Sequence, residues 1–280
     1  MKYGYVKAAL PRLLLAGWAF WVLSAQAAQE VRVGAAHFPP YVVHPEQGSD
    51  EGLLPLLIDQ LNQVQANWHF VLVPTSIARR YQDFEKGRVD MAMFENPLWG
   101  WQRIKHSAVD LGLEDAEVFV ALKDGNDQEV FDDLNGKRMA LFYGYHYAFA
   151  DFDANPQYLL RRFNAVLTYS HESNLMMIVR KRADIALVTR SFLADFIAHN
   201  PEVGSQLLVS QRVDQIYRHY ALLRPGAPIT AEEFTALMQQ MHASGRLQPI
   251  FTPAKVAVLE QPARRVAVRQ PVAKPRGGQR

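Results

Sequence analysis

The fold is constrained most strongly by a regular alternation of short apolar β-like runs with segments of helical spacing, which begins at Val31. In the segment 52–64, for example, leucines recur on one helical face. Alternating strands and helices are typical of βα units built around a parallel or mixed sheet. The first unit is predicted to contain strands at 31–36, 68–73 and 89–94 and helices at 52–64 and 76–86, the second of which ends at Gly87.

A second α/β unit opens with a polar turn, Asp-Leu-Asn-Gly-Lys, at 133–137. A last strand at 217–223 and a helix at 231–243 have no sheet of their own, so we expect them to return to the first unit. The chain then crosses between the two units twice, near 118–122 and near 217–223. Between these crossings we predict strands at 138–142, 166–169 and 185–188 and helices at 146–152, 172–181 and 191–198.

The N-terminal segment has the three parts of a secretory signal peptide. Lys2, Lys7 and Arg12 precede or enter an apolar run at 13–23, and Ser-Ala-Gln-Ala follows at 24–27. This run is shorter than the roughly 20 residues that a membrane-spanning helix requires. We therefore expect cleavage after Ala27 and export of the rest of the chain. The chain contains no cysteine, so it has no thiol for a lipid anchor or a disulfide.

Charge is distributed unevenly along the chain. The formal net charge is +2, but the signal peptide holds three positive charges, and residues 254–280 hold seven against only Glu260. The body between them is therefore near −7, which argues against nucleic acid as a partner because a phosphate backbone requires a basic surface. Residues 254–280 lack sustained periodicity and are rich in Pro, Ala, Val and Arg, so we expect a disordered basic tail.

Several short motifs follow one another in the order of a known family. They are Phe-Pro-Pro-Tyr at 38–41, a helix led by Gly52, Gly-Arg-Val-Asp at 87–90, Arg103, the turn at 133–137 and Arg-Ala-Asp at 182–184. In their order and spacing the chain resembles the periplasmic solute-binding proteins of polar amino acid ABC transporters, solute-binding protein family 3, over about residues 30–252.

The resemblance implies an α/β fold of the two-lobed type II periplasmic-binding class. Each lobe would be a mixed sheet flanked by helices, and two hinge strands would join the lobes and allow them to close on a ligand. The chain would then consist of a signal peptide (1–27), lobe 1 (28–119 and 218–253), lobe 2 (120–217) and the basic tail (254–280).

The resemblance also implies where a ligand carboxylate binds. Arg103 occupies the position whose guanidinium forks onto that carboxylate in family members, and a planar cation suits such a bidentate contact. In lobe 2, Gly144, Tyr145 and His146 stand where the family has a Gly-Ser/Thr pair at a helix N-terminus, whose amides hold the same group. A surface arginine and a tyrosine-rich surface loop are the structural alternatives for these two segments.

Other ligand contacts are implied on lobe 1. Phe38 and Tyr41 match positions where aromatic rings stack on the ligand, although both rings could equally belong to the core. Trp99 lies in a segment that replaces the family's Ser/Thr-rich approach to Arg103. Glu95 follows a predicted strand, at the end where α/β folds place ligands, and there it could meet a ligand ammonium or cap a turn.

One departure from the family's pattern concerns the amino group of the ligand. Thr189 stands where the family has an aspartate that binds the α-ammonium, and a threonine cannot neutralise that charge. The sequence therefore argues against a standard α-amino acid. Arg79, Arg80 and Arg190 could make the cleft more cationic and favour a carboxylate-rich ligand, or they could lie on helix surfaces, as we expect for Arg80.

We therefore predict a periplasmic solute-binding protein that captures a small polar, carboxylate-bearing ligand, such as an amino acid or a related metabolite, between its two lobes for ABC-type uptake or signalling. We expect a monomer whose partners are a small molecule and an inner-membrane ABC permease. No metal-ligand spacing, P-loop or G-x-S-x-G motif occurs, so no cofactor or metal is expected. The alternative is a periplasmic enzyme similar to cyclohexadienyl dehydratase, with His37, Glu95 or His146 transferring protons.

Overall fold

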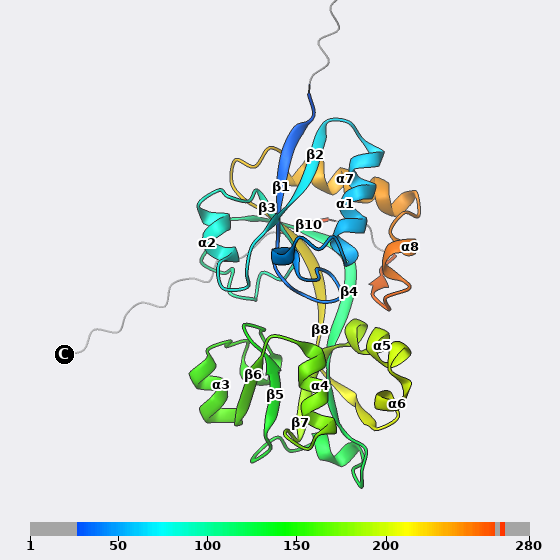
Figure 1. The fold of residues 1–280 in the computed structure, drawn as a ribbon. Helices are drawn as coiled ribbons and strands as arrows, with labels where there is room; N and C mark the ends of the chain where they lie inside the picture. The colour runs from blue at the N-terminus through cyan, green and yellow to red at the C-terminus, as the bar shows by residue number, and fades with distance from the viewer. Residues whose placement is uncertain (1–26, 261–263, 267–280) are drawn as a thin grey trace, which may run out of the picture.

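The computed structural model describes residues 27–260 and 264–266. Figure 1 shows two lobes connected by two long strands, β4 (Ser107–Leu122) and β8 (Leu207–Leu223), which pair antiparallel along their length. The strands of both lobes belong to one sheet with the order β2-β1-β3-β8-β4-β7-β5-β6. The predicted α/β fold, with two lobes joined by two strands, is confirmed.

Lobe 1 is built from the N-terminal strands β1, β2 and β3 and from helices of both the N-terminal and the C-terminal parts of the chain. Strand β1 pairs in parallel with β2 and β3, and β3 pairs antiparallel with β8. The elements are β1 (Gln29–Ala35), η1 (Pro45–Gln47), α1 (Leu53–Val64), β2 (Trp68–Pro74), α2 (Arg80–Glu85), β3 (Met91–Glu95), α7 (Ala231–Ala243) and α8 (Gln248–Phe251).

Lobe 2 is built around three shorter strands. Strand β5 pairs in parallel with β6 and β7, and β7 pairs antiparallel with β4. The elements are η2 (Gln128–Phe131), β5 (Met139–Phe142), η3 (Ala148–Ala150), α3 (Pro156–Phe163), β6 (Ala165–Thr168), α4 (His171–Val179), β7 (Ile185–Thr189), α5 (Arg190–His199) and α6 (Pro201–Gly204).

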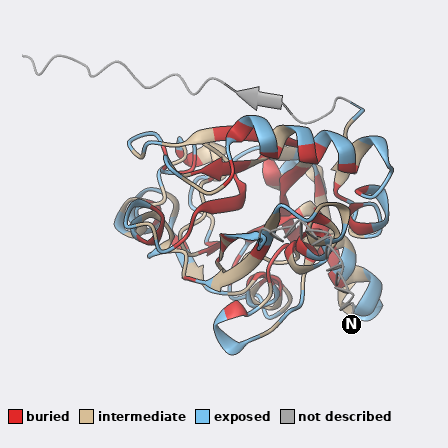
Figure 2. Ribbon diagram, turned by 90° about the horizontal axis from the view of Figure 1, so that it is seen from above, coloured by how far each residue is buried: buried red, intermediate tan, exposed pale blue. Residues whose placement is uncertain are grey.

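Helical periodicity explains how the helices pack on the sheet. In α1, Leu54, Leu57 and Leu61 recur every three or four residues and are fully buried in the core of lobe 1. Helix α7 begins with a capping box in which Thr230 and Glu233 satisfy each other's backbone N–H groups. Figure 2 shows the result: the helices turn buried residues inward and exposed residues outward.

Two predicted elements differ from the structure. The helix expected at 146–152 is only the 3-10 turn η3, because the Asp214 carboxylate accepts the N–H groups of Ala148 and Phe149 and the backbone turns left-handed at Asp151 and Phe152. The crossings expected near 118–122 and 217–223 are parts of the longer strands β4 and β8. Strand β4 already pairs with lobe 2 from Glu117 onward.

The C-terminal segment begins with ordered structure. Strand β9 (Ala257–Val258) and strand β10 (Arg264–Val266) both pair antiparallel with β4. The expectation of a disordered tail from 254 is therefore corrected for these residues, whose backbone hydrogen bonds add them to the sheet. Residues 267–280 and the predicted signal peptide, apart from Ala27, lie outside the described residues. Among the residues described, no helix is long and apolar enough to cross a membrane.

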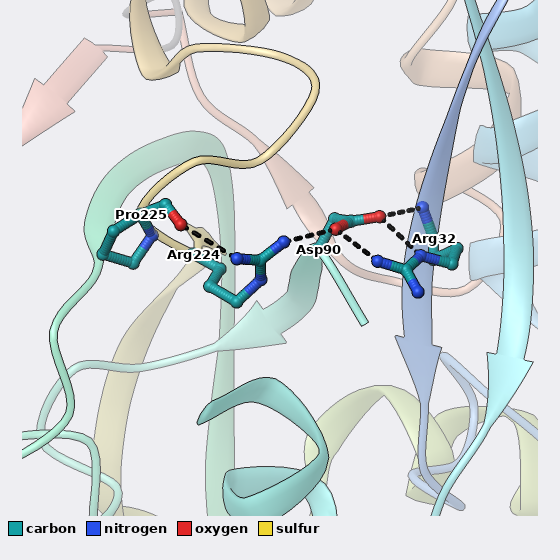
Figure 3. Close-up of polar contacts among 4 residues, drawn as sticks. All are labelled: Arg32, Asp90, Arg224 and Pro225. Atoms are coloured by element: carbon teal, nitrogen blue, oxygen red, sulfur yellow. Dashed lines mark hydrogen bonds and ion pairs between the residues drawn. The ribbon is translucent and has the colours of Figure 1, made fainter. Parts of the chain in front are cut away.

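Asp90 from the Gly-Arg-Val-Asp motif fixes the strand order of lobe 1 (Figure 3). It lies directly before β3 and is 1% exposed. Arg32 of β1 donates to both Asp90 oxygens, with Nε–Oδ2 and Nη2–Oδ1 distances of 2.8 Å, and Arg224 after β8 donates to Oδ1 at 2.8 Å. Although burial acts to raise it, these hydrogen bonds lower the pKa of Asp90 below its ordinary value.

We predict that Asp90→Asn destabilises the protein by about 2 kcal/mol at pH 7, because two arginines lose a charged partner in a partly buried site. The pKa of Asp90 is lower in the folded state than its ordinary value of 3.8. The stabilisation is therefore present above that pH and is lost as the pH falls through the folded-state pKa. Urea denaturation at pH 7 and pH 3 measures both effects.

Asp59→Asn on the exposed face of α1 is the matched control, and it should change the free energy of unfolding little. Equal destabilisation by the two substitutions at pH 7 would show that Asp90 does not have this role.

Candidate functional site

A cavity of about 70 Å³ lies between the two lobes. Lobe 1 lines it with residues of β1, the following loop, α2 and β3, and lobe 2 lines it with the segment 144–146. The crossing strands add Glu117 from β4 and Gln215 from β8. A cavity of this size, bounded by both lobes, is large enough to hold a small solute.

Direct contacts across the cavity show that the lobes are closed. The ring of Phe38 in lobe 1 meets the ring of Tyr145 in lobe 2 edge to face, at a centroid distance of 5.4 Å. The Tyr81 hydroxyl is 3.4 Å from Nε2 of His146. Gly144 lies so close to Ile77 that a Cβ atom at residue 144 would be 2.5 Å from Ile77 Cγ2.

Arg80 carries the positive charge of the cavity. It is the first residue of α2, and its side chain is only 10% exposed. Its Nε lies 2.8 Å from Glu95 Oε1, Nη1 donates to the Ile77 carbonyl, and Nη2 donates to the Tyr81 hydroxyl. A guanidinium has five N–H donors, so these three contacts leave two N–H groups for a further oxygen.

Glu95 is the partner that holds Arg80 in place. One of its oxygens is paired with Arg80, and the other accepts a 2.7 Å hydrogen bond from Nε1 of the buried Trp101. Because both oxygens are already engaged, Glu95 acts as the counter-ion of Arg80. Arg80 therefore already occupies the carboxylate that was expected to meet a ligand ammonium.

Glu117 is a buried carboxyl group without such support. It lines the cavity from β4 and is 3% exposed, and its Oε2 has no hydrogen-bond partner among the described residues. Burial, and then the charges of Asp115 and Asp214, raise the pKa of Glu117 well above its ordinary value. A carboxylate in this position is costly unless a positive group or hydrogen-bond donors reach it.

Aromatic rings from both lobes enclose the same space. Phe38 is edge to face with Trp99 at a centroid distance of 6.2 Å, as it is with Tyr145. Trp99 Nε1 and the Tyr145 hydroxyl have no hydrogen-bond partner within the described part of the chain. Burial raises the pKa of Tyr145 well above its ordinary value, so its hydroxyl stays neutral and can donate.

The two histidines at the cavity are held in neutral forms. His146 Nδ1 lies 2.7 Å from the Phe152 carbonyl, so Nδ1 carries the proton and Nε2 is left as an acceptor. Burial lowers the pKa of His146. Burial, followed by the nearby His44, also lowers the pKa of His37, whose Nδ1 accepts the backbone N–H of His44.

A buried polar network lies beside the cavity at the crossing of the lobes. The hydroxyl groups of Tyr41 in lobe 1 and Ser191 in lobe 2 both donate to Asp115 Oδ2 on β4, at 2.8 and 2.5 Å. His219 Nε2 on β8 is 2.7 Å from the Tyr41 hydroxyl. Burial lowers the pKa of His219 to about 3 and so keeps it neutral. These contacts join both lobes to one carboxyl group.

The structure brings most of the predicted ligand residues to the cavity. Those that line it are Phe38, Glu95, Trp99, Gly144, Tyr145 and His146. Tyr41 and Thr189 are fully buried next to the cavity instead. Tyr41 belongs to the Asp115 network, and the Thr189 hydroxyl contacts His171 Nε2 at 3.1 Å and the Pro39 carbonyl at 3.4 Å.

Arg103 requires a correction. Its backbone lies in a turn closed by the hydrogen bond from Ile104 N to the Trp101 carbonyl, and its side chain is exposed and outside the cavity. The arginine that lines the cavity is Arg80, which was expected on a helix surface.

Glu117 was not among the residues expected at the site. A signal for it was present, because Glu117 is a charged residue inside the otherwise apolar run 116–122. Within residues 27–260 and 264–266, no group of three His, Asp or Glu side chains could hold a metal ion.

A cavity between two α/β lobes that two sheet strands connect is the architecture of the type II periplasmic-binding fold. Residues 57–263 match the family model described as "ABC transporter, phosphonate, periplasmic substrate-binding protein", and the chain belongs to this family. The predicted class is thus confirmed, and the matching model names phosphonate where the sequence motifs resembled the polar amino acid branch. No curated protein matches the chain.

Solved structures of amino-acid-binding proteins share the fold at low sequence identity. A variant of ArgBP from T. maritima has a TM-score of 0.60 and 18% identity, with 81% of this chain and 95% of that chain covered. The GluR0 ligand-binding core from Nostoc punctiforme, in complex with L-glutamate, has a TM-score of 0.61 and 14% identity, with 80% of this chain and 98% of that chain covered. The ancestral amino acid-binding protein AncCDT-1, a precursor of cyclohexadienyl dehydratase, has a TM-score of 0.60 and 17% identity, with 80% of this chain and 94% of that chain covered.

We predict that Gly144→Ala opens the lobes, because the added Cβ would collide with Ile77. Small-angle X-ray scattering should show a larger radius of gyration for Gly144→Ala than for the wild type, and adding Ile77→Ala should reverse the change. Gly136→Ala is the matched control: its φ of +72° resembles the +78° of Gly144, and nothing lies within 4 Å of the added atom. Unchanged scattering for Gly144→Ala would contradict the close approach of the lobes.

Proposed function

We propose that this protein is exported and acts in the periplasm as a monomeric solute-binding protein, which captures a small polar ligand for uptake by an inner-membrane ABC permease or for signalling. The observation that carries the proposal is the cavity between the lobes, lined from both sides and holding one arginine and one unpaired carboxyl group. A ligand that contacts both lobes favours the closed form and so couples binding to closure.

An anionic group on the ligand is supported by Arg80. Its Glu95 pair, its helix position and its contacts with Ile77 and Tyr81 fix the guanidinium, so little side-chain entropy is lost when an anion binds. The two remaining N–H groups suit a carboxylate or a phosphonate oxygen. Both chemistries occur in the comparisons, since the family model names phosphonate and similar structures contain glutamate.

The size of the cavity supports a small ligand. At about 70 Å³ between the closed lobes, it suits a small solute. Phe38, Trp99 and Tyr145 would cover the apolar part of such a solute, and Trp99 Nε1 and the Tyr145 hydroxyl would each gain a hydrogen-bond partner.

Proton transfer is the alternative use of the same cavity. His37, Glu95 and His146 all line it, as an enzyme similar to cyclohexadienyl dehydratase would require. Glu95, however, already uses one oxygen in its pair with Arg80 and the other to accept the Trp101 Nε1 hydrogen bond. We therefore favour binding, and product analysis during the binding experiments distinguishes the two functions.

The proposal predicts that Arg80→Met weakens binding of an anionic solute by about tenfold to a hundredfold, the value of a lost charge-assisted contact. The protein should first be purified from a periplasmic extract without refolding and analysed by native mass spectrometry for a bound solute. Calorimetry then measures affinity for that solute and for a series of carboxylates, amino acids and phosphonates.

Arg103→Met is the matched control and should leave affinity unchanged, because Arg103 is exposed outside the cavity. A loss of affinity with Arg103→Met but not with Arg80→Met would contradict the proposed site. Conversion of a bound solute into a product would favour the enzymatic function instead.

A further inference from the structure

Glu117 differs from the other acidic groups at the crossing of the lobes. Asp115 on the same strand accepts hydrogen bonds from Tyr41, Ser191 and the backbone N–H of Ala116. Asp214 on β8 accepts those of Ala148 and Phe149. Burial, and then the charges of both Asp115 and Asp214, act on Glu117 and raise its pKa. The Oε2 atom of Glu117 has no hydrogen-bond donor among the described residues.

The groups around Glu117 do not supply the missing positive charge. Ionisable side chains surround it from β4, from β8, from the loop after β1 and from the segment before η3. Those whose charges act on it or respond to it are acids and tyrosines: Asp115, Asp214, Tyr41, Tyr145, Tyr147 and Tyr217. The further basic groups at the cavity are His37 and His146, whose pKa values burial lowers, and Arg80, which is already paired with Glu95. Arg190 is paired with Asp115, at 3.8 Å.

The unsatisfied oxygen belongs to a residue that lines the ligand cavity, together with Arg80. A positively charged group in the cavity would pair with Glu117, which has no such partner among the described residues. The rings of Phe38, Trp99 and Tyr145 would add favourable contacts to a cation. An amino group also brings N–H donors, which a buried carboxylate needs in addition to charge.

On the basis of the proposed function, we propose that Glu117 receives an amino group of the ligand while Arg80 holds its anionic group, and that binding expels one proton from Glu117. The protein would thus select small solutes that carry both charges. In the step, the O–H bond of the Glu117 carboxyl breaks and its proton passes to the solvent. The ammonium keeps all of its protons, and one of its N–H groups donates a hydrogen bond to the Glu117 carboxylate.

This coupling fixes the sign of the pH dependence. Without ligand, Glu117 is protonated at pH values below its raised pKa. A bound ammonium favours the carboxylate and lowers that pKa, so binding releases a proton when the pH lies between the two values. Affinity for an amino-bearing solute should therefore rise by up to tenfold per pH unit in that range. It should not depend on pH for acetate, which has no amino group and keeps the same charge near neutral pH.

The test compares matched solutes that differ only in the amino group: aminomethylphosphonate with methylphosphonate, and glycine with acetate. Isothermal titration calorimetry of the mature protein is performed in buffers of different ionisation enthalpy and at several pH values. We expect tighter binding of the amino-bearing member of at least one pair. We also expect release of up to one proton per ligand to the buffer and affinity that increases with pH.

The variant Glu117→Gln keeps the size of the side chain and removes its charge and its proton. It should reduce affinity for the amino-bearing solute at least tenfold, abolish proton release and leave the amine-free solute unaffected. Glu114→Gln, on the same strand and outside the cavity, is the matched control and should behave as the wild type. If Glu117→Gln fails to fold, the wild-type calorimetry alone still decides the matter.

The outcomes separate this inference from the proposed function. Equal binding of the two members in both pairs, or binding of the amino-bearing member without proton release at any pH tested, would overturn the role of Glu117 and leave a binding protein for anionic solutes. Failure of all four solutes to bind would contradict both the role of Glu117 and the proposed function for small anionic ligands.

Discussion

The antiparallel pairing of β4 with β8 is the constraint on which the rest of the molecule depends. These two strands belong to both lobes, and their side chains at the crossing provide the floor of the cavity and the polar network beside it. Asp115 and Glu117 are two residues apart on β4 and so face the same side of the strand. There Asp115 accepts hydrogen bonds from both lobes and Glu117 lines the cavity. The remaining strands add to the edges of this central pair, as Figure 1 shows.

Two buried acids on β4, Asp115 and Glu117, differ in whether the protein supplies hydrogen-bond donors to them. Asp115 is surrounded by hydroxyl groups from both lobes, so its burial supports the closed arrangement. Glu117 has no such donors within the described structure, and a buried carboxyl group without a partner is costly. That cost is reduced when a ligand supplies the partner. The binding energy of an amino group at Glu117 would therefore be realised in the closed form, where both lobes enclose it.

Periodicity and motif order were sufficient to predict the two lobes, because each helix shows its buried face at helical spacing and each strand is bounded by turn residues. They could not predict which arginine reaches the cavity. Arg103 was assigned to the cavity by its resemblance to the family's arginine. The turn at 101–104, however, buries Trp101 and leaves Arg103 outside, whereas the side chain of Arg80 is held inward by Glu95. Glu117 was visible as a charge in an apolar strand, yet its lack of a donor depends on tertiary contacts that one sequence does not reveal.

The account is tested most directly by a crystal structure of the mature protein with the solute that binds most tightly in calorimetry. We predict the solute in the cavity between closed lobes, with an anionic oxygen within hydrogen-bond distance of Arg80 and an amino nitrogen within hydrogen-bond distance of Glu117. A solute bound outside this cavity, or one whose charged groups contact neither Arg80 nor Glu117, would contradict the account.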